Sequence, residues 1–335
     1  MHELPDITIK KIFVCEFITA GGFNHADLTE NLAGEGELMR DALLRDLSKL
    51  PYHISTTVDA RLTKPKHCHD CIEIGKGDDA WQIWERQISQ ADAVWLIAPE
   101  TDGLLKKLTE LACLQGKLVL GCALVGVEIA SHKMATYLAL FKAKIAAIPT
   151  YTIENWPTIN GRWVVKPNDG AGCSDTLYFK RTQELSDWFA KHHKVNNHVI
   201  QPYIEGVAAS ISCLMHQGHA QLLSCNKQLI TIENSRFHYA GSQVNGMQYY
   251  WGAFESLAQK IAESNMDLNG YIGIDVIVKP DEEIVVVEIN PRLTTSYVGL
   301  AQAIGQNPAA LIINTLTKNH FKWPVLQRHI VNIHV

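Results

Sequence analysis

The sequence predicts an α/β domain with a parallel sheet, followed by an α+β region with antiparallel strands. Over the first 125 residues, short apolar strands alternate with amphipathic helical segments, which is the pattern of βαβ units. After residue 200, strands rich in Val and Ile follow one another and end in a hairpin. A chain of 335 residues with 47% hydrophobic content can form two or three domains, which we expect at 1–125, 126–200 and 201–335.

The first domain is expected to be Rossmann-like, with helices on both faces of the sheet. Its expected strands are Ile7–Thr19, His53–Val58, Ala93–Ala98 and Lys117–Gly121, and its expected helices are Glu35–Leu50, Asp79–Gln90 and Asp102–Gln115. Ligands bind such sheets at the carboxyl ends of the strands. The segments Phe17–Phe23, beside Glu16, and Ala98–Asp102 are therefore candidate substrate contacts, although both can equally be ordinary turns.

A helix is predicted at the start of the second segment. Met134–Ala147 is apolar with helical periodicity, and Ser131 precedes it in the position of an N-cap. Lys133 would then lie in the first helical turn.

A glycine loop follows a strand that ends in a lysine. Trp163–Pro167 is the strand, Lys166 lies at its end, and the loop contains Gly170, Gly172 and Ser174. Glycines allow backbone N–H groups to approach phosphate oxygens, so the loop predicts an anion site. It is not a Walker loop, because no lysine follows the glycines at the required spacing.

The third segment contains a hairpin of β-branched strands, Ile272–Val278 and Ile284–Ile289, joined by a turn at 280–283. If Lys279 pairs with Ile284, counting back along the strands fixes which residues lie opposite one another.

That register places Asp275 opposite Glu288, with Asn290 on the same face because strand side chains alternate. Two buried carboxylates need a positive charge between them. Oxygen ligands favour a hard divalent ion such as Mg²⁺, with Mn²⁺ as an alternative. The alternative is an ordinary hairpin whose acidic side chains face solvent. Two features argue against it: the final strand is nearly all Val and Ile, and Arg292 follows it directly.

The hairpin, which ends in E-I-N-P-R, resembles the ATP-grasp superfamily, whose last strands carry an Asp and then E-x-N-P-R. The lysines and the glycine loop occur in the family's order, so the resemblance covers nearly the whole chain. It implies an ATP-grasp fold with an N-terminal pre-grasp domain, and ATP and Mg²⁺ as cofactors. The implied phosphate contacts are Lys133, Lys166 and the glycine loop, and the implied metal ligands are Asp275, Glu288 and Asn290.

The resemblance also implies adenine contacts within residues 198–206, where the candidates are Gln201, Tyr203, Ile204 and Glu205. The acid that holds the ribose in the family should fall at Ala208 or Ala209, and neither can bond a hydroxyl. The ribose contact therefore stays open, and this segment can also be an ordinary strand and turn.

Within the superfamily, FVCEFITAGGF and INPRLTTSYVGL are similar to the tyramine–glutamate ligase branch of methanofuran biosynthesis. The resemblance implies an ADP-forming ligase that joins glutamate to tyramine, or to tyrosine, through an acyl phosphate. Arg292 and Lys166 would be catalytic, with the arginine neutralising the acyl phosphate. The alternatives are a small-molecule kinase on the same fold and a nucleotide-binding module without turnover.

Candidate substrate residues follow from charge and from aromatic content. Cations suit the carboxylates of an amino acid, and an aromatic wall suits an aromatic amine. The candidates are Lys227, Arg236, Thr294 and Thr295, with Phe237, Tyr239, Tyr249, Tyr250 and Trp251 as the wall. Aromatic residues in strands more often belong to the core, which is the alternative for the wall.

Composition limits the partners. The net charge is −5 and no basic run occurs, which argues against nucleic acid or an anionic membrane as a partner. The N-terminus does not resemble a signal peptide, and the longest apolar run, Leu118–Val127, is too short to span a bilayer. Eight scattered cysteines suggest a reduced compartment. We therefore expect a cytoplasmic enzyme with a small-molecule acid and amine as substrates; a homodimer is an open alternative.

One cluster, His67, Cys68, His69 and Cys71, has C-x-x-C spacing with flanking histidines. Such spacing occurs in zinc and redox sites, but no second pair of ligands lies nearby in the sequence. Whether the cluster binds a metal or is an ordinary loop stays open.

Overall fold

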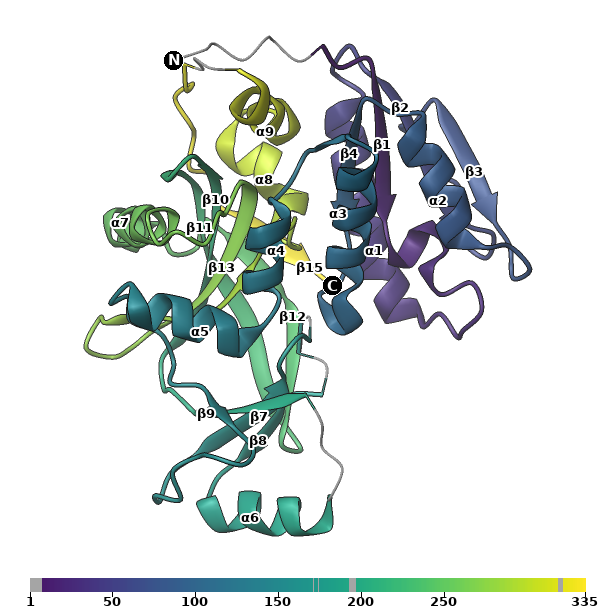
Figure 1. Ribbon diagram of the computed structural model, residues 1–335. Coiled ribbons are helices and arrows are strands. Elements are labelled where there is room, and N and C mark those ends of the chain that lie inside the picture. Colours follow the sequence, from purple (N-terminus) through teal and green to yellow (C-terminus); the bar gives the residue numbers. More distant parts are fainter. Residues whose placement is uncertain (1–7, 171, 174, 193–196, 319–321) are drawn as a thin grey trace.

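The computed structural model describes residues 8–335 except 171, 174, 193–196 and 319–321. Within those residues it contains a five-stranded parallel sheet near the N-terminus and a ten-stranded sheet in the remainder (Figure 1). The predicted fold class, a parallel α/β domain followed by an antiparallel α+β region, is confirmed. None of the helices in the described ranges has the length and apolar character that a bilayer span requires.

The N-terminal sheet has the strand order β3-β2-β1-β4-β5, and all its pairs are parallel. Because helices cover both faces, its central strands are almost wholly buried. The strands are β1 (Lys11–Glu16), β2 (His53–Asp59), β3 (Asp70–Ile74), β4 (Ala93–Ile97) and β5 (Leu118–Val119). The helices are α1 (Glu30–Leu47), α2 (Ala80–Ser89) and α3 (Leu104–Leu114).

Two features of this domain differ from the prediction. No strand was expected between His53–Val58 and Asp79–Gln90, but β3 lies there; it is a short edge strand whose side chains are mostly exposed. The first strand was expected to continue to Thr19, but it ends at Glu16 and a single π-helical turn, Ile18–Gly22, follows. Gly21 has φ 96° there, and a Cβ on it would lie 2.8 Å from Ile74.

The middle of the chain forms two helices and a small antiparallel group of strands. These elements are α4 (Leu124–Ala130), α5 (Lys133–Lys142), β6 (Tyr151–Thr152), β7 (Trp163–Pro167), β8 (Leu177–Phe179), α6 (Thr182–Lys191) and β9 (His198–Pro202). β7 has the predicted bounds, whereas α5 ends five residues before the predicted Ala147.

The predicted cap of α5 is wrong. Ser131 ends α4, and its buried hydroxyl makes no hydrogen bond. The start of α5 is instead held by Asn168, from the loop after β7. Its backbone carbonyl accepts from Lys133 N at 2.8 Å and its side-chain oxygen accepts from Met134 N at 3.0 Å. The glycine loop and the helix N-terminus are thereby tied together.

The larger sheet runs β14-β13-β10-β11-β12-β8-β7-β9-β6, with β15 on β12, so it continues across residue 200. Its remaining strands are β10 (Val207–His216), β11 (His219–Glu233), β12 (Arg236–Val244), β13 (Gly270–Val278), β14 (Ile284–Asn290) and β15 (Val331–His334). Helices α7 (Trp251–Ala262), α8 (Tyr297–Ile304) and α9 (Pro308–Thr317) complete the fold.

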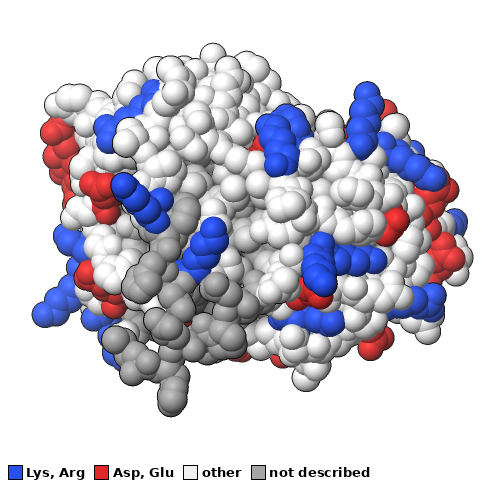
Figure 2. Space-filling view, turned by 90° about the horizontal axis from the view of Figure 1, so that it is seen from above, with Lys and Arg blue, Asp and Glu red and all other residues white. Residues whose placement is uncertain are grey.

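One apolar core joins the two sheets. Leu43 and Leu47 of α1 belong to the same buried cluster as Leu300 and Ile304 of α8 and Ile312 of α9. Figure 1 shows α8 and α9 beside the N-terminal domain. On the face seen in Figure 2, basic and acidic side chains are interspersed. The two sheets are thus held together by apolar packing.

Candidate active site

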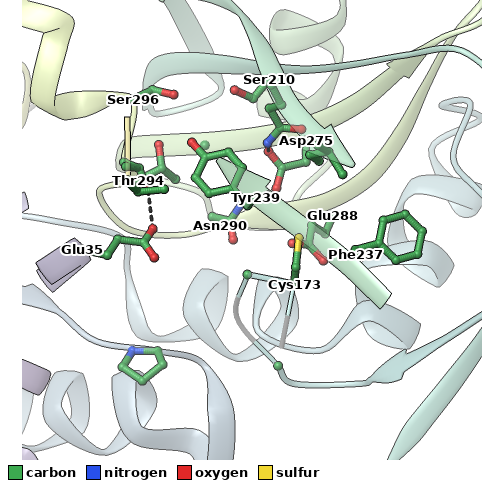
Figure 3. A pocket seen from close by; sticks show the side chains of 18 of the residues that line it. Glu35, Cys173, Ser210, Phe237, Tyr239, Asp275, Glu288, Asn290, Thr294 and Ser296 are labelled. Carbon is green, nitrogen blue, oxygen red and sulfur yellow. Dashed lines mark hydrogen bonds between the residues drawn. The ribbon is translucent and has the colours of Figure 1, made fainter. Parts of the chain in front are cut away.

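A large cleft lies where the carboxyl ends of the N-terminal strands face the hairpin β13–β14. Its volume is about 1860 Å³. Its walls come from α1, the segment after β4, the glycine loop, β9 and strands β10 to β14 (Figure 3). A space of this size can hold a nucleotide and two further small molecules at once.

The hairpin places Asp275 opposite Glu288, as predicted, but by a different route. Near the turn, Ile284 pairs with Val278, one residue earlier than the sequence predicts. A β-bulge at Val287 then adds one residue to β14 and restores the pairing at the carboxylates. Without the bulge, Glu288 would point to the opposite face of the sheet.

The two carboxylates and the amide meet at one face (Figure 3). Asp275 accepts from Gln228 Nε2 at 2.9 Å and from Asn290 Nδ2 at 3.1 Å. Burial and the neighbouring Glu288 raise the pKa of Asp275 to about 7. The raised pKa shifts Asp275 toward its neutral form, which reduces the repulsion between the two carboxylates.

Both predicted lysines contact one of these carboxylates. Lys133 Nζ lies 3.3 Å and Lys166 Nζ 3.4 Å from the same oxygen, Glu288 Oε2. Burial would raise the pKa of Glu288, but the two ammonium groups outweigh it and hold that pKa at about 2. Burial also lowers the pKa of Lys166. Two buried cations around one anion leave positive charge for phosphate.

The start of the glycine loop is anchored by hydrogen bonds at Asp169 and Gly170. The carboxylate of Asp169 is buried and accepts from the backbone N–H of Asp102 at 3.1 Å and from Asn197 Nδ2 at 2.6 Å. Lys133 Nζ donates to the carbonyl of Gly170 at 2.6 Å. Gly170 and Gly172 line the cleft, and the predicted contact Ser174 lies outside the described residues.

Arg292 makes a bidentate ion pair across the two domains. Its Nε and Nη2 each donate at 2.9 Å to the carboxylate of Glu100, which is buried after β4. Burial would lower the pKa of Arg292, but Glu100 reverses the effect and the pKa is raised. Glu100 was predicted as a substrate contact; it holds the arginine instead.

The adenine candidates divide into two groups. Gln201, Tyr203 and Ile204 line the cleft. Glu205 does not; its carboxylate is exposed and pairs with Arg162 at 2.9 Å. Gln201 is buried and donates to the hydroxyl of Thr150 at 2.9 Å, which holds β9 in place.

The substrate candidates divide as well. Lys227, Thr294 and Thr295 line the cleft, as do Phe237 and Tyr239 from the proposed aromatic wall. The other candidates lie elsewhere, since β12 alternates its faces and the chain then turns away into α7; these are Arg236, Tyr249, Tyr250 and Trp251.

Sequence reasoning missed several residues that line the cleft. Glu35, on α1, points into it and accepts a hydrogen bond from the hydroxyl of Thr295 (Figure 3). Ser210 and Gln228 lie beside the carboxylates. The available signal for Glu35 was its place between Gly34 and Gly36, because two glycines inside a helix are costly without a local reason.

The histidine–cysteine cluster makes contacts with neighbouring residues of the N-terminal domain. His69 Nδ1 accepts from the Ile54 backbone at 3.0 Å, and His53 pairs with Asp70 at 2.7 Å. A hydrogen bond from Cys71 lowers the pKa of Cys68 to about 7. The described residues contain no group of three or more His, Cys, Asp or Glu suited to a metal.

The hairpin residues fit a divalent ion whose coordination is completed by substrate oxygens. Asp275 and Glu288 supply carboxylates, and Asn290 gives its amide nitrogen to Asp275, which leaves its oxygen as the atom for an ion. Two carboxylates and one amide make a hard oxygen donor set. An ion would also relieve the repulsion that raises the pKa of Asp275.

Known proteins share these features. Residues 130–296 match the ATP-grasp domain family and residues 52–127 match the pre ATP-grasp 3 domain. The chain is 28% identical, over 97% of each sequence, to the tyramine–L-glutamate ligase of Methanocaldococcus jannaschii.

Two solved structures have the same fold. An ATP-grasp superfamily protein from Archaeoglobus fulgidus has a TM-score of 0.71 at 22% identity, over 97% of this chain and 99% of that one. The biotin carboxylase domain of Hydrogenobacter thermophilus 2-oxoglutarate carboxylase, solved with MgADP, has a TM-score of 0.72 at 14% identity, over 96% and 72%. The chain belongs to the ATP-grasp superfamily and is an ATP-dependent ligase.

Proposed function

We propose that this ligase joins the side-chain carboxylate of glutamate to the amine of tyramine, or of tyrosine, in a methanofuran-type biosynthesis. The observation that carries the proposal is the convergence of two lysines, two carboxylates and an arginine at one end of a cleft long enough for three substrates. The relative from M. jannaschii supports the choice of substrates.

Phosphate binding is assigned to Lys133, Lys166 and the glycine loop. Both ammonium groups lie on Glu288, so phosphates bound beside it would share cations that are already in place. Such preorganised charge reduces the reorganisation needed when the γ-phosphoryl group moves. Mg²⁺, bound by Asp275, Glu288 and Asn290, would supply charge neutralisation at the β- and γ-phosphate oxygens. Mn²⁺ is the alternative ion.

Arg292 is assigned to the acyl phosphate. The acid's carboxylate oxygen attacks the γ-phosphorus, and ADP leaves. Glu100 holds the guanidinium by Nε and Nη2, and Nη1 donates to the Leu293 carbonyl at 3.1 Å, so the group is fixed in orientation. A fixed cation beside the acyl phosphate stabilises both that species and the tetrahedral adduct formed when the amine attacks.

Trapping the activated acid tests the proposal. With glutamate, ATP and Mg²⁺, but hydroxylamine in place of the amine, the enzyme should form a hydroxamate and ADP. Oxygen-18 placed in the acid's carboxylate should appear in the released phosphate. Label in AMP would mean that the acid is adenylated, and the assignment of Arg292 would then be wrong.

A screen of ADP release over amino acids crossed with amines tests the substrate pair. Glutamate with tyramine or tyrosine should give the highest rate. A stable phosphoester in place of free phosphate would indicate a kinase. The cytoplasmic location and the homodimer stay predictions; size-exclusion chromatography tests the second.

A further inference from the structure

We propose that Glu35 is the residue that binds the ammonium group of the amine substrate and removes its proton before it attacks the acyl phosphate. The inference rests on the proposed function and deepens it, because it assigns the acceptor half of the cleft.

Glu35 is a carboxylate without a cation. Its one hydrogen bond comes from the Thr295 hydroxyl, and no lysine, arginine or histidine in the part of the chain that the structure describes forms an ion pair with it. Arg292, the cation whose pKa Glu35 helps to raise, is already held by Glu100. A half-buried carboxylate that faces a cleft and lacks a partner is a suitable site for an ammonium group.

Glu35 also lies near the residues assigned to the reaction. Glu35 lies close enough to Arg292 and to the Cys173 thiol for its charge to raise the pKa of each. Burial raises the pKa of that thiol to about 11, and Glu288 and Asp275 act on it as well. In Figure 3, Asn290 lies between Glu35 and the carboxylates of Asp275 and Glu288, and all four residues line the cleft, so an amine held by Glu35 would share the cleft with the metal ligands.

The face of α1 that carries Glu35 continues as an apolar strip. Leu38, Met39 and Ala42 follow at intervals of three, four and seven residues, so they share its face. All three border the cleft; Leu38 is exposed, and Met39 and Ala42 are mostly buried in the apolar core behind it. An amine whose ammonium group lies on Glu35 would extend its carbon skeleton along this strip. That geometry suits an aromatic ring separated from the nitrogen by a short chain.

The two glycines beside Glu35 differ in their surroundings: Gly36 packs closely against β1, and Gly34 faces open space in the cleft. A Cβ on Gly36 would lie 2.7 Å from Glu16 Oε2, so the glycine lets α1 pack closely on β1. Gly34 lines the cleft and no atom lies within 4 Å of the position its Cβ would take. A glycine inside a helix is unfavourable by about 1 kcal/mol, and here Gly34 leaves open space at the wall of the cleft.

The chemistry balances without a further reactant. Glu35 takes one proton from the ammonium group, and the free amine forms the C–N bond to the acyl carbon. The C–O bond to phosphate then breaks, and phosphate leaves with the electron pair. The second proton of the nitrogen leaves with phosphate, and Glu35 releases its proton to solvent.

The decisive variant is Glu35→Gln, assayed with two nucleophiles. With tyramine, kcat/KM should fall by about 100-fold or more, because a general base and a counter-ion are lost together. With hydroxylamine, which is neutral and needs neither, hydroxamate formation should stay within about 3-fold of wild type. Glu110→Gln, which removes an exposed charge on α3 outside the cleft, is the matched control and should keep both rates.

The outcomes separate the two proposals. If wild type forms no hydroxamate, the proposed function fails, whatever Glu35 does. If wild type forms it and Glu35→Gln loses both reactions equally, or neither, the role of Glu35 is wrong. Should Glu35→Gln fold poorly, Glu35→Asp gives the same test: it should lose about 10-fold with tyramine and keep its hydroxamate rate.

A substitution at Gly34 tests where in the cleft the amine binds. Gly34→Leu fills that space and improves helix propensity, so the protein should fold. It should raise the KM for tyramine by about 10-fold and leave the hydroxylamine reaction unchanged. An unchanged KM for tyramine would place the amine elsewhere in the cleft. Gly34→Ala is the control for the backbone change.

Discussion

Glu288 contacts both Lys133 and Lys166, so its replacement should affect stability as well as activity. Glu288→Gln leaves Lys133 and Lys166 buried without an anion, and breaking such a contact typically costs about 3–5 kcal/mol. Asp275→Asn removes a repulsion instead, so its stability should stay near wild type. Both variants should lose more than about 100-fold in kcat.

Thermal melts without ligand test the predicted change in stability. ADP release across a Mg²⁺ titration tests the predicted loss of kcat. Added ATP should recover much of the stability lost in Glu288→Gln, since phosphate replaces the missing anion. Equal melting temperatures for the two variants without ligand would mean that the lysines do not depend on Glu288.

Glu16 predicts a pH effect on stability. It is 1% exposed, and burial raises its pKa above the 4.5 of the unfolded chain. A carboxyl group with a raised pKa in the folded state stabilises the fold while protonated, and this contribution is lost as the pH rises. Glu16→Gln should therefore raise the melting temperature by about 2 °C at pH 8 and by less at pH 5.

The matched control is Glu85→Gln, an exposed carboxylate on α2. Its melting temperature should follow wild type at both pH values. A larger gain for Glu16→Gln at pH 5 than at pH 8 would reverse the sign and show that Glu16 is ionised and well paired in the fold.

At the scale of elements, the cap of α5 gives a paired test. Asn168→Ala removes a side-chain acceptor from Met134 N and should cost about 1 kcal/mol in the free energy of unfolding. Ser131→Ala removes a buried hydroxyl that makes no bond, so it should be neutral or slightly stabilising. Urea unfolding distinguishes them, and the reverse order would restore Ser131 as the cap.

The same element shows where sequence reasoning stops. Periodicity located α5 and Lys133 correctly, because these depend on neighbours along the chain. The residue that caps the helix is more than thirty positions away, and local spacing cannot identify it. A serine one position before the N-cap was a reasonable but wrong choice, since tertiary contacts override local preference.

The hairpin shows a second limit. Asp275 and Glu288 were correctly paired, but the count assumed a regular ladder, and a bulge at Val287 offset an error of one residue at the turn. Backbone irregularities depend on packing across the sheet, which alternation of side chains does not reveal. β3 was missed for a related reason, because an edge strand needs little apolar surface.

At the scale of the molecule, the shared core predicts a single unfolding transition. Leu43 of α1 packs in one cluster with Leu300 of α8 and Ile312 of α9, so neither sheet can lose its fold alone without exposing apolar surface. ATP with Mg²⁺ at 100 times its Kd should stabilise the whole by about 2.7 kcal/mol. NADH or GTP should do markedly less.

Scanning calorimetry measures both properties. Two transitions, of which ATP shifts only the second, would mean that the domains unfold independently. Equal stabilisation by NADH would point to a dinucleotide in the N-terminal domain. What the sequence could not supply at this scale is the pairing of Arg292 with Glu100, which are 192 positions apart.

That ion pair has a consequence for protein engineering. Arg292 follows β14 in the ATP-grasp domain, but the carboxylate that orients it belongs to the N-terminal domain. A hybrid enzyme that takes its N-terminal domain from a relative would receive a different amine site. It would also receive a different residue in the place of Glu100, which orients Arg292. Exchange of domains should therefore give active hybrids only when the donor brings an acid to the end of β4, so substrate choice and catalytic competence would be inherited together.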